Sequence, residues 1–233
     1  NICAVYVDEN GNVHWLTDSV YDSAEKVLRF RTNHFSVYGV GYREEAPSFA
    51  DIAGHWAKED IEFVASRRLF KGTSEATFSP DMNMTRGMFI TVLGRLADAD
   101  VSSYRQSSFN DVKNDAFYMG YIEWARKSGI VNVTGNGTFA PDQPVTREQL
   151  AVIMQNYAKV AGFELPKVHE EITFADSEKI STYANDAVKA MQMAGILSGK
   201  DGNLFDPQGT ATRAEISSVL RRFVELISSV TLF

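Results

Sequence analysis

Apolar residues recur with helical spacing in three parts of the chain. After each of Arg86, Arg147 and Arg213, apolar side chains stand at the third, sixth, seventh and tenth positions. The matched residues are Phe89, Val92, Leu93 and Leu96, then Leu150, Ile153, Met154 and Tyr157, then Ile216, Val219, Leu220 and Phe223. This spacing places the apolar side chains on one face of an α-helix. It predicts a helix of about three turns or more after each arginine.

A helix start precedes each of these patterns. Each arginine follows a threonine, which is a preferred N-cap residue because its side-chain oxygen can accept a bond from a free backbone N–H. These threonines are Thr85, Thr146 and Thr212. Gln149 and Glu215 stand three residues after the threonine and complete capping boxes, whereas Met88 interrupts the box in the first copy.

A shorter helix is predicted upstream of each long one. The matched apolar residues are Ile61, Ile122 and Val188, and then Val64, Ala125 and Met191. Gly129 and Gly195 suit the C-terminal end of this helix, and Arg68 takes that place in the first copy. The turn signals "FSPD", "FAPD" and "FDPQ" lie between the two helices. Each unit therefore reads as helix–loop–helix and must pack on its neighbours to bury its apolar face.

The first 45 residues follow a different pattern. "CAVYVDENGNVHWL" alternates apolar and polar residues around Asn10-Gly11, which predicts a β-hairpin. "KVLRFRTNHFSVYGVGY" supplies two more extended stretches around Thr32-Asn33. Two hairpins alone are marginal in water. We expect this segment to be either a small β-meander or the last strands of a β domain that continues upstream, since the chain begins at Asn1 and not at Met.

These patterns divide the chain into four segments. Residues 1–45 form the β-strand segment, and residues 46–105, 106–168 and 169–233 form repeats 1, 2 and 3. The predicted fold class is mainly α, with three helix–loop–helix repeats after a short β segment.

Composition excludes several classes of protein. The 233 residues are 44% apolar and 23% charged, as in ordinary globular proteins. The net charge of −7 argues against general nucleic-acid binding. Cys3 is the only cysteine, which excludes an internal disulfide and paired-cysteine zinc sites. The chain has no run of 18 apolar residues, so no membrane-spanning helix is predicted. The histidines lack ligand spacing and no nucleophile motif is present, so we expect no metal, no cofactor and no catalysis.

Three pairs of phrases carry a resemblance to a known family. "FADIAGHW" (49–56), "FNDVKNDAF" (109–117) and "FADSEKISTY" (174–183) align with one another. Each precedes a phrase of the type "TFSPDMNMTRGM" (77–88), "TFAPDQPVTREQ" (138–149) or "LFDPQGTATRAE" (204–215). Together they resemble the S-layer homology (SLH) family, over residues 49–227. "TNHFSVYGV" (32–40) also resembles a segment that often precedes such repeats.

The resemblance implies a fold and a function. Three SLH repeats form a pseudo-threefold spindle around a central helical bundle, with grooves between the repeats. The grooves bind secondary cell wall polysaccharide linked to peptidoglycan, commonly through pyruvylated N-acetylmannosamine. The expected protein is thus a non-covalent, non-enzymatic anchor that tethers a surface protein in the cell wall or S-layer of a Gram-positive-type bacterium. We expect it to be extracellular and monomeric.

Arginine is the side chain best matched to the carboxylate of a pyruvyl ketal, because its planar fork can donate two hydrogen bonds to it. Arg86, Arg147 and Arg213 are therefore candidate binding residues, each beside the free N–H groups of a helix start. Their structural alternative is an ion pair or a solvated first-turn position.

Each of the other candidate binding residues has two interpretations. Asp51, Asp111 and Asp176 could accept bonds from sugar hydroxyls or could cap or form turns. Trp56, with Phe117 and Tyr183 at the matching positions, could stack on a sugar or pack under the first helix. Gly72 and Gly199 could contact the ligand or permit a tight turn or a close backbone approach. Val133 stands where the other repeats have these glycines, so the grooves are not expected to be equal.

Two other functions remain open at this point. The repeats could mediate lateral protein–protein assembly in a surface layer with vestigial sugar grooves. Alternatively, the chain could be the non-catalytic anchor of a polysaccharide-degrading enzyme. Large apolar patches would favour assembly.

Overall fold

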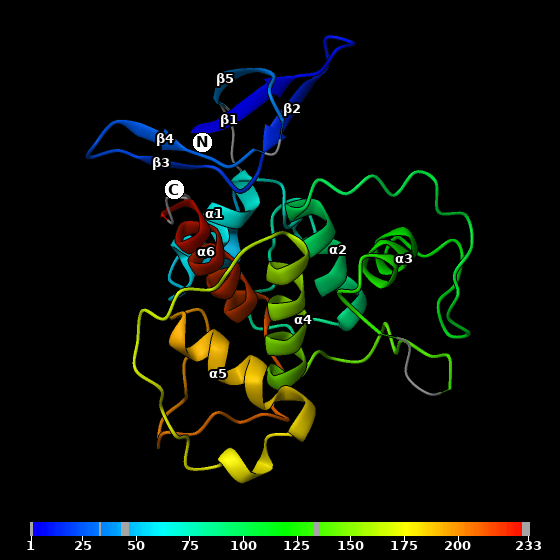
Figure 1. Cartoon of the computed structure of the whole chain (residues 1–233), viewed down its shortest axis with the longest axis vertical. Coiled ribbons are helices and arrows are strands. Elements are labelled where there is room, and N and C mark those ends of the chain that lie inside the picture. Colours follow the sequence, from blue (N-terminus) through cyan, green and yellow to red (C-terminus); the bar gives the residue numbers. More distant parts are fainter. Residues whose placement is uncertain (1, 33, 43–46, 133–135, 230–233) are drawn as a thin grey trace. The chain divides into compact units, whose positions relative to one another are not determined.

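The computed structural model describes residues 2–32, 34–42, 47–132 and 136–229 (Figure 1). The chain divides into two compact units. One contains residues 1–80 and 217–233, and the other contains residues 81–216. The predicted turn at Asn33 and the position of Val133 lie outside the described residues.

The N-terminal residues form two small antiparallel sheets. In the first, β1 (Ile2–Val7) lies between β2 (Val13–Leu16) and β5 (Val37–Tyr42). In the second, β3 (Val20–Asp22) pairs with β4 (Val27–Arg29). The hairpin predicted around Asn10-Gly11 is confirmed, because Val7 pairs with Val13 across a turn in which Gly11 has φ +82°.

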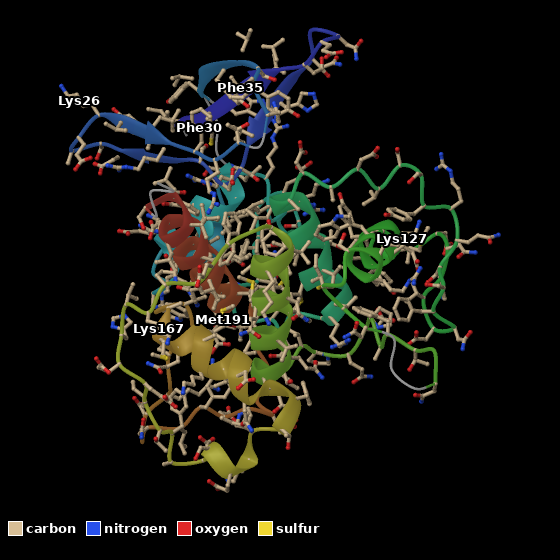
Figure 2. The ribbon with its side chains drawn as sticks, viewed as in Figure 1. Lys26, Phe30, Phe35, Lys127, Lys167 and Met191 are labelled. Carbon is tan, nitrogen blue, oxygen red and sulfur yellow. The ribbon has the colours of Figure 1, made fainter. Side chains whose placement is uncertain are left out.

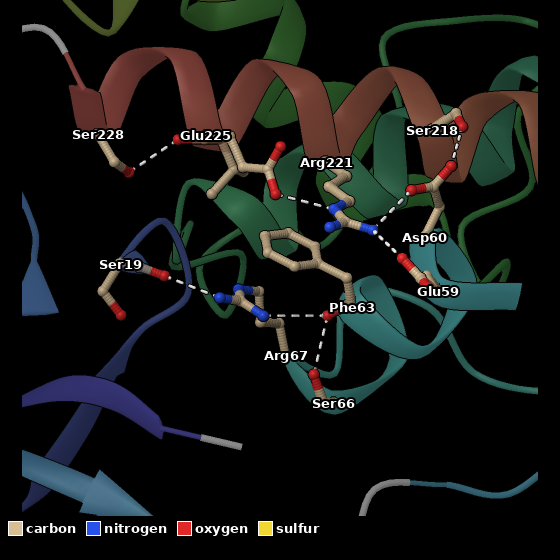
Figure 3. Close-up of polar contacts among 11 residues, drawn as sticks. Ser19, Glu59, Asp60, Phe63, Ser66, Arg67, Ser218, Arg221, Glu225 and Ser228 are labelled. Atoms are coloured by element: carbon tan, nitrogen blue, oxygen red, sulfur yellow. Dashed lines mark hydrogen bonds and ion pairs between the residues drawn. The ribbon is translucent and has the colours of Figure 1, made fainter. Parts of the chain in front are cut away.

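Polar contacts attach this β segment to helices of the same unit. Arg67 follows α1 (Lys58–Ser66), and its Nη2 donates a 3.0 Å hydrogen bond to the carbonyl of Ser19 (Figure 3). Its guanidinium carbon also lies 3.5 Å from the centroid of the Phe63 ring. Ser228, near the end of α6 (Arg213–Ser229), donates to the carbonyl of Asp18. The β strands therefore share a packed boundary with the helices.

An ion-pair network joins α1 to α6 (Figure 3). Arg221 lies 3.1 Å from the Asp60 carboxylate and 2.8 Å from that of Glu225. Ser218 also donates a hydrogen bond to Asp60. Hydrogen bonds to these carboxylates raise the pKa of Arg221 against the opposing effect of burial.

This network predicts a measurable loss of stability in the variant Asp60→Asn. The Asp60 side chain is 21% exposed, so solvent partly screens its ion pair with Arg221. We therefore expect the pair to contribute about 1 kcal/mol to stability. The matched control is Glu59→Gln, because the Glu59 side chain is 84% exposed and lies 3.6 Å from Arg221. Urea denaturation should show a lower midpoint for Asp60→Asn only. Equal midpoints for both variants would contradict the structural role of the network.

The predicted helix pairs are present in all three repeats. The short helices are α1, α3 (Met119–Lys127) and α5 (Asn185–Met193), and the long ones are α2 (Arg86–Leu96), α4 (Arg147–Val160) and α6. Short 3-10 turns lie at Ala50–Ile52, Ser177–Lys179 and Thr182–Ala184. Every apolar position predicted from the spacing after the three arginines is at most 5% exposed. Met191 of α5 is fully buried among its neighbours (Figure 2).

The predicted caps are confirmed. Thr85 and Thr146 accept bonds from the backbone N–H three residues later, and Gln149 completes a capping box. Thr212 and Glu215 make the same reciprocal bonds. Just beyond the short helices, Gly129 (φ +77°) and Gly195 (φ +72°) adopt the left-handed conformation, as does Arg68 (φ +58°) in the first repeat. These positions therefore end the helices by backbone conformation.

The expectation of a mainly α fold is wrong. Besides six α-helices, the described residues contain five strands in two antiparallel sheets. The physical reason lies in β5, which pairs with β1 along its whole length, from Ile2 opposite Tyr42 to Val7 opposite Val37. The chain is therefore a mixed α and β protein. The four segment boundaries given above stay predictions.

Candidate functional site

A cyclic set of backbone hydrogen bonds connects the starts of the three long helices. The N–H of Met84 donates to the carbonyl of Ala211, Ala211 donates to Val145, and Val145 donates to Met84. The donor–acceptor distances are 2.9, 3.2 and 2.9 Å. Each residue stands two positions before a repeat's arginine. We call this set the backbone ring. It fixes the position of the backbone from which each arginine side chain extends.

Two of the arginines reach into the following repeat in the same way. Arg86 Nε donates a 2.9 Å bond to the carbonyl of Phe139, and Arg147 Nε donates a 2.7 Å bond to that of Phe205. Each guanidinium also lies over the ring of the phenylalanine whose carbonyl it contacts, at 4.6 and 5.0 Å from the centroid. The arginines therefore mark the junctions between successive repeats.

The surroundings of the arginines differ. Arg86 is half-buried, and its Nη1 donates a 3.0 Å bond to Oε1 of Gln149. Arg147 is 6% exposed, and its Nη2 donates a 2.7 Å bond to the carbonyl of Ser198. Arg213 is also 6% exposed. Burial lowers the pKa of Arg86 and Arg147 from its ordinary value.

The three aspartates bind the loop between the two helices of their own repeat. Asp176 accepts bonds from the N–H groups of Phe205 (2.7 Å) and Asp206 (2.8 Å). Asp51 and Asp111 bind the matching loop residues in the same way. The second residue of each bonded pair has a left-handed backbone: Ser79 (φ +58°), Ala140 (φ +58°) and Asp206 (φ +57°). The carboxylates thus hold a strained turn, and sugar contact by them stays a prediction.

The aromatic residues at the start of the short helices face solvent. Trp56 is 66% exposed, and Phe117 and Tyr183 are each 61% exposed. Of the two alternatives for these rings, packing under the first helix does not hold, and stacking on a sugar stays a prediction. Phe117 makes an edge contact with Tyr118, at 4.9 Å between centroids. Exposed rings of this kind are available to stack on another molecule.

The two glycines lie where the backbone passes close to other atoms. A Cβ on Gly72 would lie 2.3 Å from the carbonyl oxygen of Ser74 and 2.7 Å from that of Thr77. A Cβ on Gly199 would lie 2.8 Å from the Phe174 ring. Their prediction as sites of close backbone approach is confirmed, and ligand contact by them stays a prediction.

This crowding predicts that Gly72→Ala destabilises the chain by about 2 kcal/mol, because backbone carbonyls cannot move aside cheaply. Gly54→Ala is the matched control, since nothing lies within 4 Å of a Cβ there. Thermal unfolding should separate the two variants clearly. A Gly72→Ala variant as stable as wild type would rule out the close approach.

Glu148 is a buried carboxylate that sequence reasoning did not single out. It is 3% exposed, and it accepts bonds from Ser181 (N–H and hydroxyl, each 2.9 Å), from the Tyr183 hydroxyl (2.9 Å) and from Gln208 (2.8 Å). The signal available in the sequence was the contrast between repeats. Glu148 is charged, whereas Gly87 and Ala214, at the matching positions of the other two repeats, are not. Glu148 therefore connects repeat 2 to repeat 3.

The hydrogen bonds of Glu148 predict a dependence of stability on pH. Burial acts to raise its pKa, but the bonds from Ser181, Gln208 and Tyr183 outweigh it and hold the pKa below its ordinary value. A carboxylate with a lowered folded-state pKa stabilises the chain above its unfolded-state pKa and loses this effect as the pH falls through the folded-state pKa. Burial and the bond to Glu148 together raise the pKa of Tyr183 to about 12.

We expect Glu148→Gln to lower the free energy of unfolding by about 1 to 2 kcal/mol at pH 7. The difference from wild type should shrink below about pH 4.5, where the wild-type carboxylate begins to be protonated in the unfolded chain. Melting temperatures between pH 7 and pH 3 measure this. A constant difference across that range would contradict the assigned charge state.

Comparison with known proteins identifies the repeats. The S-layer homology domain model matches residues 48–88, 108–151 and 173–216, which together exceed half of the chain. The chain belongs to the S-layer homology domain family. SLH domains anchor surface proteins to the cell wall, and this SLH chain is a cell-surface, cell-wall-associated protein.

Similar proteins include both enzymes and surface-layer proteins. The SLH chain is 32% identical to an amylopullulanase of Thermoanaerobacterium thermosulfurigenes, over 88% of the chain and 11% of the enzyme. It is 31% identical to the exoglucanase XynX of Acetivibrio thermocellus, over 79% and 17%. It is 25% identical to the S-layer protein EA1 of Bacillus anthracis, over 74% and 20%. The SLH chain thus spans a fifth or less of each relative's length.

The similarity extends beyond the repeats. The alignment with the amylopullulanase covers 205 of the 233 residues, so it begins at residue 29 or earlier and includes β5.

In the part of the chain that the structure describes, no helix is long and apolar enough to span a bilayer. Those same residues place no three histidine, cysteine or acidic side chains together as metal ligands.

Proposed function

We propose that the SLH chain anchors its protein by binding secondary cell wall polysaccharide that is linked to peptidoglycan. The ligand would be a polymer that carries a pyruvyl ketal, as in pyruvylated N-acetylmannosamine. The observation that carries this proposal is the half-buried Arg86, held by Phe139 and Gln149 at the junction of repeats 1 and 2. A partly desolvated guanidinium with donors left over suits a carboxylate better than a neutral sugar.

Tyr118 lies against Gly87, the residue after Arg86, and with its neighbours would supply the other parts of a sugar site. The Phe117 ring is exposed and rests edge-on against Tyr118. The Tyr118 hydroxyl donates a 3.2 Å bond to Asp142. An apolar ring beside polar groups matches the two faces of a hexose. With a net charge of −7, binding would depend on these local contacts and not on long-range attraction.

In this proposal the chain is a monomeric, non-catalytic module, and the anchored partner is the remainder of its own protein. The relatives suggest two kinds of cargo, a polysaccharide-degrading enzyme or a structural S-layer protein. The site involves no covalent chemistry.

Cosedimentation with purified cell walls tests the proposal. One portion of the walls keeps its secondary polymer, and the other is stripped by acid to bare peptidoglycan. The chain should pellet with intact walls and stay in solution with stripped walls. Equal pelleting with both preparations would exclude the polymer as the ligand.

A second candidate function is lateral assembly, and the β segment favours it. Within the described residues, β5 pairs with β1 alone and exposes Val37 (73%), Val40 (70%) and Tyr42 (63%), near the fully exposed Phe35 (Figure 2). An unprotected apolar edge strand can pair with another copy. Sedimentation velocity should then show dimers that Val40→Lys abolishes, whereas the anchoring proposal expects monomers in both cases.

A further inference from the structure

The β segment carries far more exposed apolar surface than its size accounts for. Among the described residues, half of the large apolar side chains that face solvent lie within residues 2–42, which make up less than a fifth of the chain. They are Val7, Val13, Tyr21, Val27, Phe35, Val37, Val40 and Tyr42. A contiguous apolar surface on a soluble protein marks a place where another structure binds.

The strand register gathers three of these side chains into one row. Val7 of β1 lies opposite Val13 of β2 and opposite Val37 of β5. Side chains of opposite residues point to the same face of a sheet, so the three valines cross the whole three-stranded sheet. We call them the valine row. The Trp15 ring extends over the same face as far as Gly41, where a Cβ would lie 2.6 Å from it. Every strand position on this face holds an apolar residue or glycine.

The opposite face of the sheet is covered at one end by the chain itself. Tyr6 and Tyr38 are cross-strand partners on that face, and the Phe30 ring lies 5.1 Å from the Tyr38 ring (Figure 2). Val40 and Tyr42 continue the same face along β5 and remain exposed. The aromatic contact therefore leaves the end of β5 and the whole valine row open to solvent.

The free edge of β5 lacks the usual protection of an edge strand. Natural edge strands carry charged residues, proline or a bulge, which prevent further pairing. The β5 sequence, VYGVGY, contains no charged residue and no proline. Its partner within the described residues is β1 alone, so its other edge is unpaired. Apolar side chains on both faces and an unprotected edge are typical of a strand inside a larger sheet.

The contacts between the β segment and the helices lie away from this surface. Arg67 donates to the carbonyl of Ser19, and Ser228 donates to that of Asp18. Both carbonyls belong to the connection between β2 and β3. The helices of this unit thus hold the β segment without covering the valine row, whose members are 36 to 73% exposed.

We propose that the valine row and the free edge of β5 bind β structure from the remainder of the same protein. A strand of that part continues the sheet beyond β5, and a second sheet packs on the valine row, as in a two-layer β domain. The inference rests on the proposed function, in which the remainder of the protein is the anchored partner, and it adds the surface where that partner docks.

The relatives and the charge of the chain favour this occupant. The alignment with the amylopullulanase includes β5 but covers only 11% of the enzyme, so most of such a protein lies outside the SLH chain. A segment of the same polypeptide is also held near β5 at a high effective concentration. A second copy has no such advantage, and two copies that each carry a net charge of −7 repel one another. Docking would fix the orientation of the anchored part on its anchor.

Hydrogen exchange tests the pairing of β5. The peptide Val37–Tyr42 is compared between the 233-residue chain and the protein expressed from its complete gene. Its fast-exchanging amides should slow by about tenfold or more in the complete protein, because new strand pairing protects them. The loop at residues 97–108 is the control and should exchange equally in both. Equal exchange of the β5 peptide would overturn the proposed pairing.

Maleimide labelling tests the cover over the valine row. Val37→Cys should react about tenfold or more slowly in the complete protein than in the 233-residue chain. Val168→Cys is the matched control, because Val168 is 51% exposed outside the β segment, and Cys3 is buried and adds little background. Equal rates at position 37 would overturn the inference.

The same samples separate the other outcomes. Protection of Val37→Cys that increases with the concentration of the 233-residue chain would assign the surface to a second copy and overturn the proposed occupant. Cosedimentation with intact walls is measured in parallel. A chain that fails to pellet while its position 37 is protected in the complete protein would reject anchoring alone, whereas a chain that pellets without such protection would reject docking alone.

Discussion

Replacing Asp176 with alanine is expected to lower the free energy of unfolding by about 3 kcal/mol. Its carboxylate is 5% exposed and accepts bonds from two backbone N–H groups, those of Phe205 and Asp206. Without it, both donors lose their partner and the left-handed turn at Asp206 loses its support. The two hydrogen bonds also hold the pKa of Asp176 below its ordinary value, against the larger single effect of burial.

The matched comparison is Asp111→Ala. Asp111 makes the same two bonds in repeat 2, but it is exposed, so water can replace the carboxylate. We expect its loss to cost clearly less than that of Asp176. Asp176→Asn should fall between wild type and alanine, since an amide oxygen can still accept. Urea denaturation of the three variants measures this order, and an Asp111→Ala variant less stable than Asp176→Ala would contradict the explanation.

Removing one donor from the backbone ring should lower the free energy of unfolding more than Asp176→Ala does. Val145→Pro deletes the N–H that donates 2.9 Å to Met84, leaves that carbonyl without its partner and interrupts the cyclic set. We expect a loss of about 4 kcal/mol or more, which is a large share of the about 5–15 kcal/mol by which a typical domain is stable.

Val145→Ala separates the backbone effect from the side chain. It keeps the N–H and removes only the methyl groups of a fully buried residue, which should cost about 2 kcal/mol. Urea denaturation followed by circular dichroism should show a clearly lower midpoint for the proline variant than for the alanine variant. Equal stability of the two would mean that the ring contributes little.

The helices of the repeats could be predicted from sequence because their signals are local. Apolar spacing, the threonine caps and the glycines after the short helices each act within a few residues of where they are read. The predicted positions of Phe89, Leu150 and Ile216 are accordingly all buried.

The backbone ring could not be predicted, because it joins residues far apart in sequence through main-chain atoms. Met84, Val145 and Ala211 share no side-chain feature that signals a hydrogen bond. The first 45 residues were predicted as a short β segment, either a small meander or the end of an upstream domain, since the alternation of β5 does not show that it pairs with β1 over its full length.

The candidate site residues were chosen from sequence by residue type, and the structure shows structural contacts for several of them. Arg86 and Arg147 lie at the junctions between repeats, and sugar binding by them stays a prediction. The aspartates bind their own loops, which sequence alone could not distinguish from sugar contact. Glu148 was missed because a charged residue in a helix's first turn is ordinary, and its burial depends on Ser181 and Tyr183 of the next repeat.

The central claim is that the wall polymer is recognised through its ketal carboxylate. The most direct measurement is a titration of the purified, soluble polymer, before and after mild acid removes the pyruvyl groups. The account predicts saturable binding of the intact polymer and at least tenfold weaker binding of the treated polymer. Equal binding of both forms would contradict it.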